Sequence, residues 1–244
     1  MKYYNKKELG KIFVRFLFYI LFIILLVNIA VRTESSWQKW FLIVFGVIAL
    51  VVTGLSEYLK YLYNQALYAL NFELNPEKAI VFFDKVDAHD IFKGYRKTRY
   101  VFDVQVSIEQ NRAEDALDII EKQYDYFNSS VELKMIQYYY QLRAYCMLNR
   151  HNKLKATYEN INRLRRLKKP PRIFSFDEID GIYYLGMKDY RKAYRSFQKV
   201  DMKYMNPKEC CFILKQLCLL SKDGKNQKYK KEYDELVGEI YESK

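Results

Sequence analysis

The stretch Asp189–Val200, DYRKAYRSFQKV, carries the pattern that decides the fold. Four other stretches align with it without gaps: NPEKAIVFFDKV from Asn75, NRAEDALDIIEKQ from Asn111, NKLKATYENINRL from Asn152 and KNQKYKKEYDEL from Lys225. Aligned on Pro76, Ala113, Leu154, Tyr190 and Asn226, the five stretches recur at spacings of 37, 41, 36 and 36 residues. A period of this length predicts a protein built from structural repeats.

Each stretch has the spacing of a helix that buries one face. Three residues after the anchor stand Ala79, Ala116, Thr157 and Ala193, and Tyr229 breaks the pattern. Seven residues after it stand Phe83, Ile120, Ile161, Phe197 and Tyr233, and ten after it Val86, Gln123, Leu164, Val200 and Leu236. These spacings place the side chains on one helix face.

Helix start signals divide the chain further. We expect Asn75, Asn111, Asn152 and Asp189 to be N-caps, because their side-chain oxygens accept from free N–H groups of the first turn. Other apolar-periodic helices precede the stretches, and Ser129–Glu132 and Ser175–Glu178 have the spacing of capping boxes. A further helix begins at Asn206–Pro207. The repeating unit is therefore a helix pair, which buries its apolar face only when several pairs stack.

The unit from Ser175 to Pro207 resembles the tetratricopeptide repeat family. The residues that carry the resemblance are Gly181, Tyr184, Tyr190, Ala193, Phe197 and Pro207. No unit has the family's first-helix Trp, and the 41-residue spacing departs from the family's usual period. The resemblance implies an all-α fold in which residues 57–244 form an α-solenoid of about five helix pairs.

In this family the first helices of the pairs line a concave groove that binds peptides. Carried onto this chain, the resemblance implies that the groove is lined by Gln105, Glu109, Tyr139, Asn149, Arg150, Ser175 and Glu178. For each of these side chains a place in the core, Tyr139 above all, is the alternative.

Residues 1–56 are predicted to anchor the chain in a membrane. Ile12–Val31, IFVRFLFYILFIILLVNIAV, is long enough to cross the hydrocarbon core, and Trp40–Leu55, WFLIVFGVIALVVTGL, follows after a short connection. We expect two transmembrane helices, at about 12–31 and 38–56, that form a hairpin. No Gly or Pro stands between Ser56 and Phe72, so the second span should continue as one helix into the repeats.

Basic residues set the expected orientation. Lys2, Lys6, Lys7 and Lys11 precede the first span, whereas the connection holds only Arg32 and Lys39 with Glu34. Positive residues favour the cytoplasmic side. The sequence therefore predicts a multi-pass protein of the cell membrane with both termini in the cytoplasm, and the composition, rich in Lys, Tyr and Ile, indicates a bacterial source.

The strongest charged feature is NRLRRLKKPPR, which holds Arg163, Arg165, Arg166, Lys168, Lys169 and Arg172 without an acid. The whole chain carries a net charge of +12. A solvated helix end, whose cations suit the helix dipole, is one interpretation of this stretch. Docking of anionic lipid or of an acidic partner is another. Nucleic acid is disfavoured, because no nucleic-acid motif is present.

No catalytic, metal or cofactor motif stands out. The cysteines, Cys146, Cys210, Cys211 and Cys218, form no CxxC pair and are interpreted as core residues. His89 between Asp87 and Asp90 is the one candidate for an acid–base site, and no nucleophile motif supports it. The sequence predicts a membrane-anchored scaffold, not an enzyme, whose repeats bind another protein at the cytoplasmic face. Two alternatives stay open: an accessory subunit of a membrane complex that packs through the hairpin, near Gly46 and Gly54, and an enzyme around His89.

Overall fold

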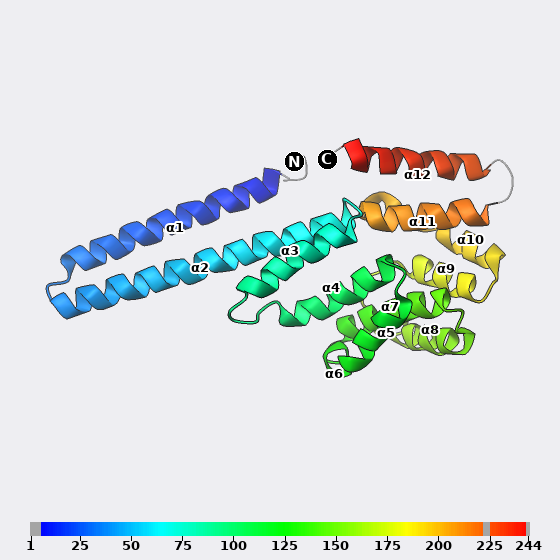
Figure 1. Ribbon diagram of the computed structural model, residues 1–244, viewed down its shortest axis with the longest axis horizontal. Helices are drawn as coiled ribbons and strands as arrows, with labels where there is room; N and C mark the ends of the chain where they lie inside the picture. Colours follow the sequence, from blue (N-terminus) through cyan, green and yellow to red (C-terminus); the bar gives the residue numbers. More distant parts are fainter. Residues whose placement is uncertain (1–5, 222–224, 243–244) are drawn as a thin grey trace. The chain divides into compact units, whose positions relative to one another are not determined.

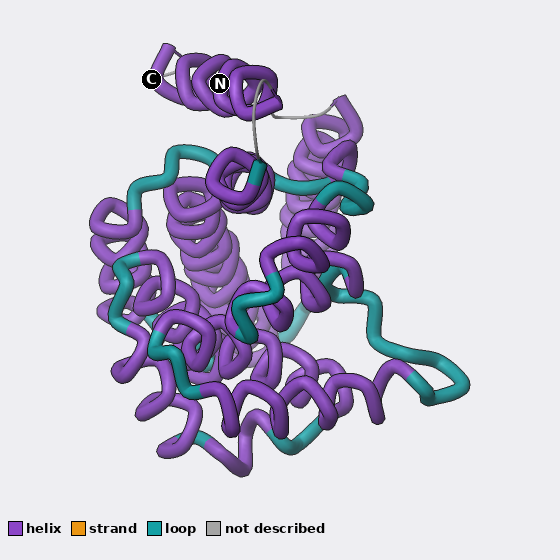
Figure 2. Tube along the Cα trace, turned by 90° about the vertical axis from the view of Figure 1, so that its right-hand side faces the viewer, coloured by secondary structure: helices purple, strands orange, loops and turns teal. Residues whose placement is uncertain are grey.

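The computed structural model describes residues 6–221 and 225–242, and within these ranges the chain is all-helical, without strands (Figure 1). The elements are α1 (Lys6–Arg32), α2 (Ser36–Asn71), α3 (Pro76–His89), α4 (Arg96–Glu109), α5 (Ala113–Lys122), α6 (Tyr124–Phe127), α7 (Val131–Met147), α8 (His151–Arg165), α9 (Phe176–Gly186), α10 (Tyr190–Phe197), the 3₁₀ helix η1 (Met202–Tyr204), α11 (Pro207–Leu220) and α12 (Lys225–Glu242). Figure 2 shows short loops joining most of these helices.

The chain divides into two compact units, one up to Tyr61 and one from Leu62 to Glu242. The division falls inside α2, which runs unbroken from Ser36 to Asn71. This confirms the expectation of a single helix from the second apolar stretch into the repeats. The division lies five residues after the expected boundary at 56/57.

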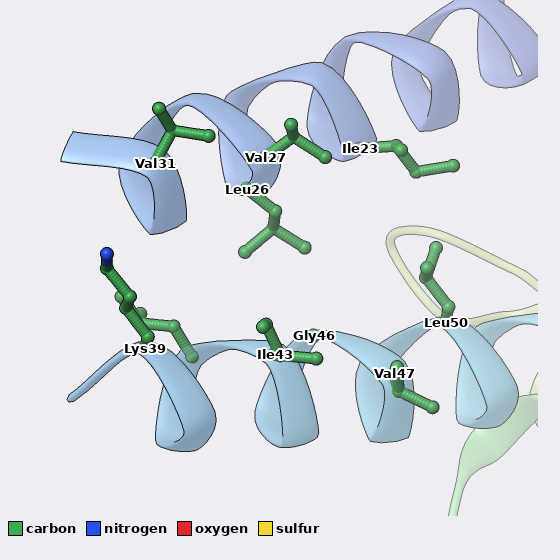
Figure 3. Close-up of a pocket in the computed structure, with 10 residues that line it drawn as sticks. Ile23, Leu26, Val27, Val31, Lys39, Ile43, Gly46, Val47 and Leu50 are labelled. Atoms are coloured by element: carbon green, nitrogen blue, oxygen red, sulfur yellow. The ribbon is translucent and has the colours of Figure 1, made fainter. Parts of the chain in front are cut away.

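In the first unit, α1 and the N-terminal part of α2 are joined by residues 33–35. Gly46 lets them approach closely, since a Cβ at this position would lie 2.6 Å from Cδ1 of Leu26. Beside this contact the two helices enclose a space of about 570 Å³ (Figure 3). It is lined by Ile23, Leu26, Val27, Val31, Lys39, Leu42, Ile43, Gly46, Val47 and Leu50.

One helix among the described residues, α2, is long and apolar enough to cross a membrane. In α1 the described apolar stretch, Tyr19–Ile29, is shorter. The outward side chains of α2 are strongly exposed large apolar groups, such as Phe41 at 62% and Val51 at 64%.

In the second unit, consecutive helices pack in pairs: α4 with α5, α7 with α8, α9 with α10, and α11 with α12. The pairs contact one another mainly through α5 with α7, α7 with α9, and α10 with α11. The buried residues at the second-helix positions are those expected from the alignment, among them Ala79, Ala116, Thr157 and Ala193. Gly181 allows α9 and α10 to approach closely, since a Cβ there would lie 2.6 Å from Cε1 of Phe197.

The same turn recurs between the helices of three pairs. Asn111, Asn149 and Lys188 have left-handed φ angles of 58°, 53° and 61°, each two residues before the next helix begins. The following N–H donates to the carbonyl five residues earlier, at 2.8, 3.0 and 2.9 Å. This bond closes the C-terminus of the first helix, a position where Asn tolerates the left-handed conformation. The prediction that Asn111 is an N-cap is therefore wrong.

The N-cap prediction for Asn152 is also wrong, because α8 begins at His151 and Arg150 occupies the cap. The helix has three residues before the anchor Leu154, and the short helix α6 lies in the same unit, so both lengthen the spacing to 41 residues. The N-caps at Asn75 and Asp189 are confirmed by bonds from N–H groups three residues later, at 2.9 and 3.2 Å.

The two expected capping boxes are each corrected. Ser130, not Ser129, caps α7, and its hydroxyl accepts from the Leu133 N–H at 3.1 Å. Ser129 instead donates its hydroxyl to the Tyr126 carbonyl of α6. Ser175 caps α9 as expected, but the Glu178 carboxylate does not bond back to it. It turns toward Tyr139, and this contact leads to the candidate site.

Candidate binding groove

A pocket of about 340 Å³ lies among the first helices of the pairs, α4, α7, α9 and α11. It is lined by Leu74, Ile108, Glu109, Asn111, Arg143, Cys146, Met147, Ile182, Leu185, Lys208, Cys211, Phe212, Lys215 and Gln216. The wall is mixed: apolar side chains alternate with one carboxylate and three cations. Such a surface can hold a short segment of another molecule by both apolar contact and charge.

An ion pair holds one side of this pocket. Arg143 of α7 donates to Oε1 of Glu109 on α4 at 3.1 Å, and their side chains are only 12% and 24% exposed. The guanidinium also lies 4.6 Å from the ring centre of Phe212 on α11. Three helices are thus tied together by one side chain. Because the pair is largely shielded from water, its attraction is stronger than that of a surface ion pair.

A second buried contact joins α7 and α9 beneath the pocket. The Tyr139 hydroxyl donates to Oε1 of Glu178 at 2.5 Å, and both residues are 2% exposed. The Phe174 ring stacks on Tyr139 with centroids 3.6 Å apart. Burial raises the pKa of Glu178, while the bond from Tyr139 and the charge of Arg143 act to lower it. Burial is the largest of these effects, so the pKa of the Glu178 carboxyl stays above its usual value.

Lys208 is the unusual member of this cluster. It is only 8% exposed, yet within the described ranges it has no ion pair and no side-chain hydrogen bond. Burial lowers the pKa of Lys208, an effect that the charge of Glu109 opposes and that of Arg143 reinforces. Its place in the first turn of α11, which begins at Pro207, is also unfavourable for a cation. The pocket therefore contains a positive charge that lacks a direct partner.

The residues implied by the family resemblance are only partly brought together. Tyr139 bonds to Glu178, and Glu109 pairs with Arg143, which lies four residues after Tyr139 on α7. Gln105 lies on α4 and does not line the pocket. Tyr139 is a core residue, as the alternative interpretation held. Ser175 caps α9 and lines a second pocket of about 360 Å³ together with Glu178 and Arg172.

Asn149 and Arg150 do not line the first pocket. Asn149 forms the turn between α7 and α8, and Arg150 pairs instead with Glu114 of α5. Arg143 and Lys208 line the pocket and were not expected from the sequence. Arg143 follows Tyr139 by four residues, and this spacing places both side chains on the same helix face, so the sequence held a signal for Arg143.

The basic stretch is divided by the structure. Arg165 is bound internally: it pairs with Asp180 at 2.8 Å, donates to the Phe176 carbonyl at 3.0 Å and lies over the Phe176 ring at 4.5 Å. It therefore holds α9 against α8 and is not available for docking. The other cations of the stretch are exposed: Arg163, Arg166, Lys168, Lys169 and Arg172.

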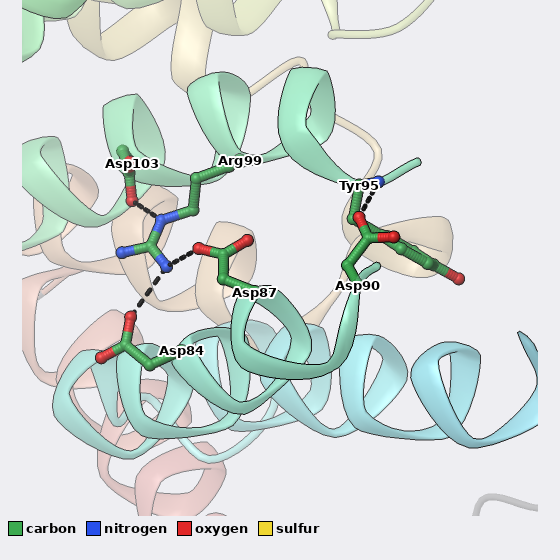
Figure 4. A network of polar contacts seen from close by, with 6 residues as sticks. All are labelled: Asp84, Asp87, Asp90, Tyr95, Arg99 and Asp103. Atoms are coloured by element: carbon green, nitrogen blue, oxygen red, sulfur yellow. Dashed lines mark hydrogen bonds and ion pairs between the residues drawn. The ribbon is translucent and has the colours of Figure 1, made fainter. Parts of the chain in front are cut away.

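The two aspartates beside His89 in the sequence, Asp87 and Asp90, bind other parts of the α3–α4 segment. His89 Nδ1 donates to the Lys85 carbonyl at 2.8 Å. Asp87 pairs with Arg99, which also binds Asp84 and Asp103, and Asp90 accepts two backbone N–H groups of its own turn (Figure 4). The contacts of Arg99 tie α3 to α4.

The cysteines are unpaired. Burial raises the pKa of the Cys146 and Cys211 thiols to about 11 in each case, so both are neutral near pH 7. No group of three His, Cys, Asp or Glu residues within the described ranges could hold a metal ion.

Comparison with known proteins returns no match: no family model, no curated protein and no solved structure is significantly similar to this chain.

Proposed function

We propose that this protein is a membrane-anchored scaffold whose second unit, a tetratricopeptide-like α-solenoid, binds an acidic segment of another protein at the cytoplasmic face. The observation that carries the proposal is Lys208, which is 8% exposed and has no ion pair among the described residues, in a pocket made by four helices. A carboxylate of the bound segment would supply the missing negative charge. The apolar wall formed by Ile108, Ile182 and Phe212 would hold neighbouring side chains.

The recurrent left-handed turn supports the repeat interpretation. The same backbone conformation stands at Asn111, Asn149 and Lys188, although the three side chains differ. A shared turn with divergent residues is what an array of related helix pairs would retain. Pairing of consecutive helices from α4 to α12 supports it as well.

The membrane anchor is supported by α2, with its length and its exposed apolar surface. Large apolar side chains exposed along a helix are unfavourable in water but favourable in lipid. In the proposal α1 crosses as the partner of α2, and both termini are cytoplasmic. Reporter proteins fused to each end, active only in the cytoplasm, test this orientation. Activity at one end only would contradict the two-span topology.

The binding proposal is tested with the full chain in lipid nanodiscs and an array of short acidic peptides, each paired with its Asn/Gln counterpart. Lys208→Met should weaken binding of the acidic peptides by about 10-fold or more, the loss of one charge-assisted hydrogen bond. Lys122→Met is the matched control, since this exposed lysine of α5 lies outside the pocket. Equal binding of acidic and amide peptides, no binding to either, or an unaffected K208M variant, would overturn the proposal.

A further inference from the structure

The turn between α3 and α4 exposes two adjacent large apolar side chains. Ile91 is 75% exposed and Phe92 is 70% exposed. Of the other large apolar side chains described in the second unit, only Leu219, at 72%, is exposed to a similar degree. Leu219 stands alone near the end of α11, whereas Ile91 and Phe92 form the tip of a turn.

This turn is held in shape by its own hydrogen bonds. Oδ1 of Asp90 accepts from Gly94 N at 3.0 Å. Oδ2 of Asp90 accepts from Tyr95 N at 2.7 Å (Figure 4). Lys93, with a left-handed φ of 54°, donates its N–H to the Asp90 carbonyl at 3.0 Å. Because these backbone groups are already paired, transferring the tip from water into a less polar medium leaves fewer of them without a partner.

The residues after the tip are cationic. Lys93, Arg96 and Lys97 are exposed, and no acid stands between Ile91 and Lys97. The nearest acids are engaged: Asp90 binds the turn itself, and two carboxylates of α3 pair with Arg99. Apolar side chains beside exposed cations form the chemistry that suits the boundary between anionic headgroups and acyl chains.

The course of α3 carries this tip back along α2. Asn75, before α3, bonds to the Ala69 carbonyl of α2 at 2.9 Å, and Phe83, further along α3, packs on Tyr63 with ring centroids 5.7 Å apart. α3 therefore runs antiparallel to this end of α2, toward that helix's N-terminus. Tyr95, which closes the turn, also packs on Tyr63 at 5.2 Å.

We infer that the α3–α4 turn inserts Ile91 and Phe92 into the headgroup layer of the same membrane, with Lys93, Arg96 and Lys97 against anionic headgroups. The inference rests on the membrane anchoring in the proposed function. It gives the second unit a second attachment to the bilayer besides α2, so that the repeats are held in one orientation at the surface.

The test places a tryptophan at the tip. Phe92→Trp is made in the full chain together with Trp37→Phe and Trp40→Phe, so that the introduced indole emits alone. The protein is reconstituted in vesicles of phosphatidylcholine and phosphatidylglycerol with brominated acyl chains, which quench indoles at the acyl boundary. Leu219→Trp in the same background is the matched control, because this site is equally exposed. In Figure 1 the C-terminal end of α11 lies at the opposite end of the second unit from the α3–α4 turn.

We expect the emission of F92W to shift to the blue and to be quenched, and that of L219W to remain unchanged. Equal emission of the two variants in brominated and unbrominated vesicles would overturn the inference. The chain that retains Trp37 and Trp40 distinguishes this failure from failure of the anchor. If its native indoles are quenched and the F92W indole is not, the anchor stands and the turn does not insert; unquenched native indoles contradict the anchor itself.

Discussion

Lys208→Met should stabilise the free protein while it removes the proposed binding. The Lys208 side chain is 8% exposed, its cation lies in the first turn of α11, and Arg143 adds a like charge. Glu109, Glu178 and Glu209 offset part of this penalty without forming a direct ion pair. Replacing a buried ion pair by well-packed apolar residues of similar volume is often neutral or stabilising by roughly 1–4 kcal/mol, and the desolvation penalty that this relieves applies to Lys208 as well. With the carboxylates as partial compensation, we expect a gain of about 1–2 kcal/mol at pH 7.

The stability difference between K208M and the wild type should decrease as the pH rises, because the pKa of Lys208 is lowered in the folded protein. Between that pKa and 10.5 the unfolded chain binds more protons than the folded one, so wild-type stability rises with pH there. Below this window the full penalty of the buried charge is present, and above 10.5 it disappears. The advantage of K208M should therefore be largest near neutral pH and should shrink as the pH approaches 10.5.

Thermal unfolding of the full chain in mild detergent, followed by circular dichroism at several pH values, measures this difference. A gain of this size corresponds to a rise in Tm of about 2–8 °C. Lys215→Met is the control, because Lys215 lines the same pocket but is exposed, and it should change stability by less than about 0.5 kcal/mol. A lower Tm for K208M at neutral pH, or an advantage that does not decline with rising pH, would refute the reasoning.

Three further substitutions test the packing around the groove. Tyr139→Phe removes the hydroxyl that donates to Glu178 and should destabilise the protein by about 1–3 kcal/mol. Urea unfolding in detergent measures this loss, and an unchanged unfolding midpoint would contradict the buried hydrogen bond. Gly181→Ala should lower the free energy of unfolding by about 1–3 kcal/mol, because the new methyl would lie against Phe197. Gly238→Ala is the control and should raise it by up to about 1 kcal/mol, because nothing lies within 4 Å of that position. Similar effects of both variants on the urea midpoint would refute the close approach of Gly181 to Phe197. Arg99→Met leaves Asp84, Asp87 and Asp103 without their shared cation and should lower Tm at pH 7. The loss should shrink as the pH falls, because Asp103, whose pKa is already raised by burial, then takes up a proton. A loss of Tm that is independent of pH would exclude this mechanism.

Helix positions could be predicted from the sequence because burial is local to each helix face. The spacing of Ala79, Phe83 and Val86 repeats in the other units, and all three are fully buried in the structure. The helix ends were harder to predict. An Asn before an apolar run satisfies the preference for an N-cap and equally the preference for a left-handed turn residue. Asn75 serves as a cap, whereas Asn111 serves as a turn residue. The two roles differ by the length of the turn, which the sequence pattern does not specify.

The candidate site could be predicted only where a helix face determined it. The family resemblance implied Glu109, Tyr139 and Glu178 through their positions on first helices; Tyr139 and Glu178 bond to each other, and Glu109 pairs with Arg143. Lys208 could not be found in this way, since a lysine after Asn206–Pro207 at a helix start has the pattern of an exposed residue. It is buried because α4, α7 and α9 converge on the first turn of α11, a contact among segments far apart in the chain. The burial of Lys208 is therefore a property of the assembled helices, and no single helix pattern in the sequence predicts it.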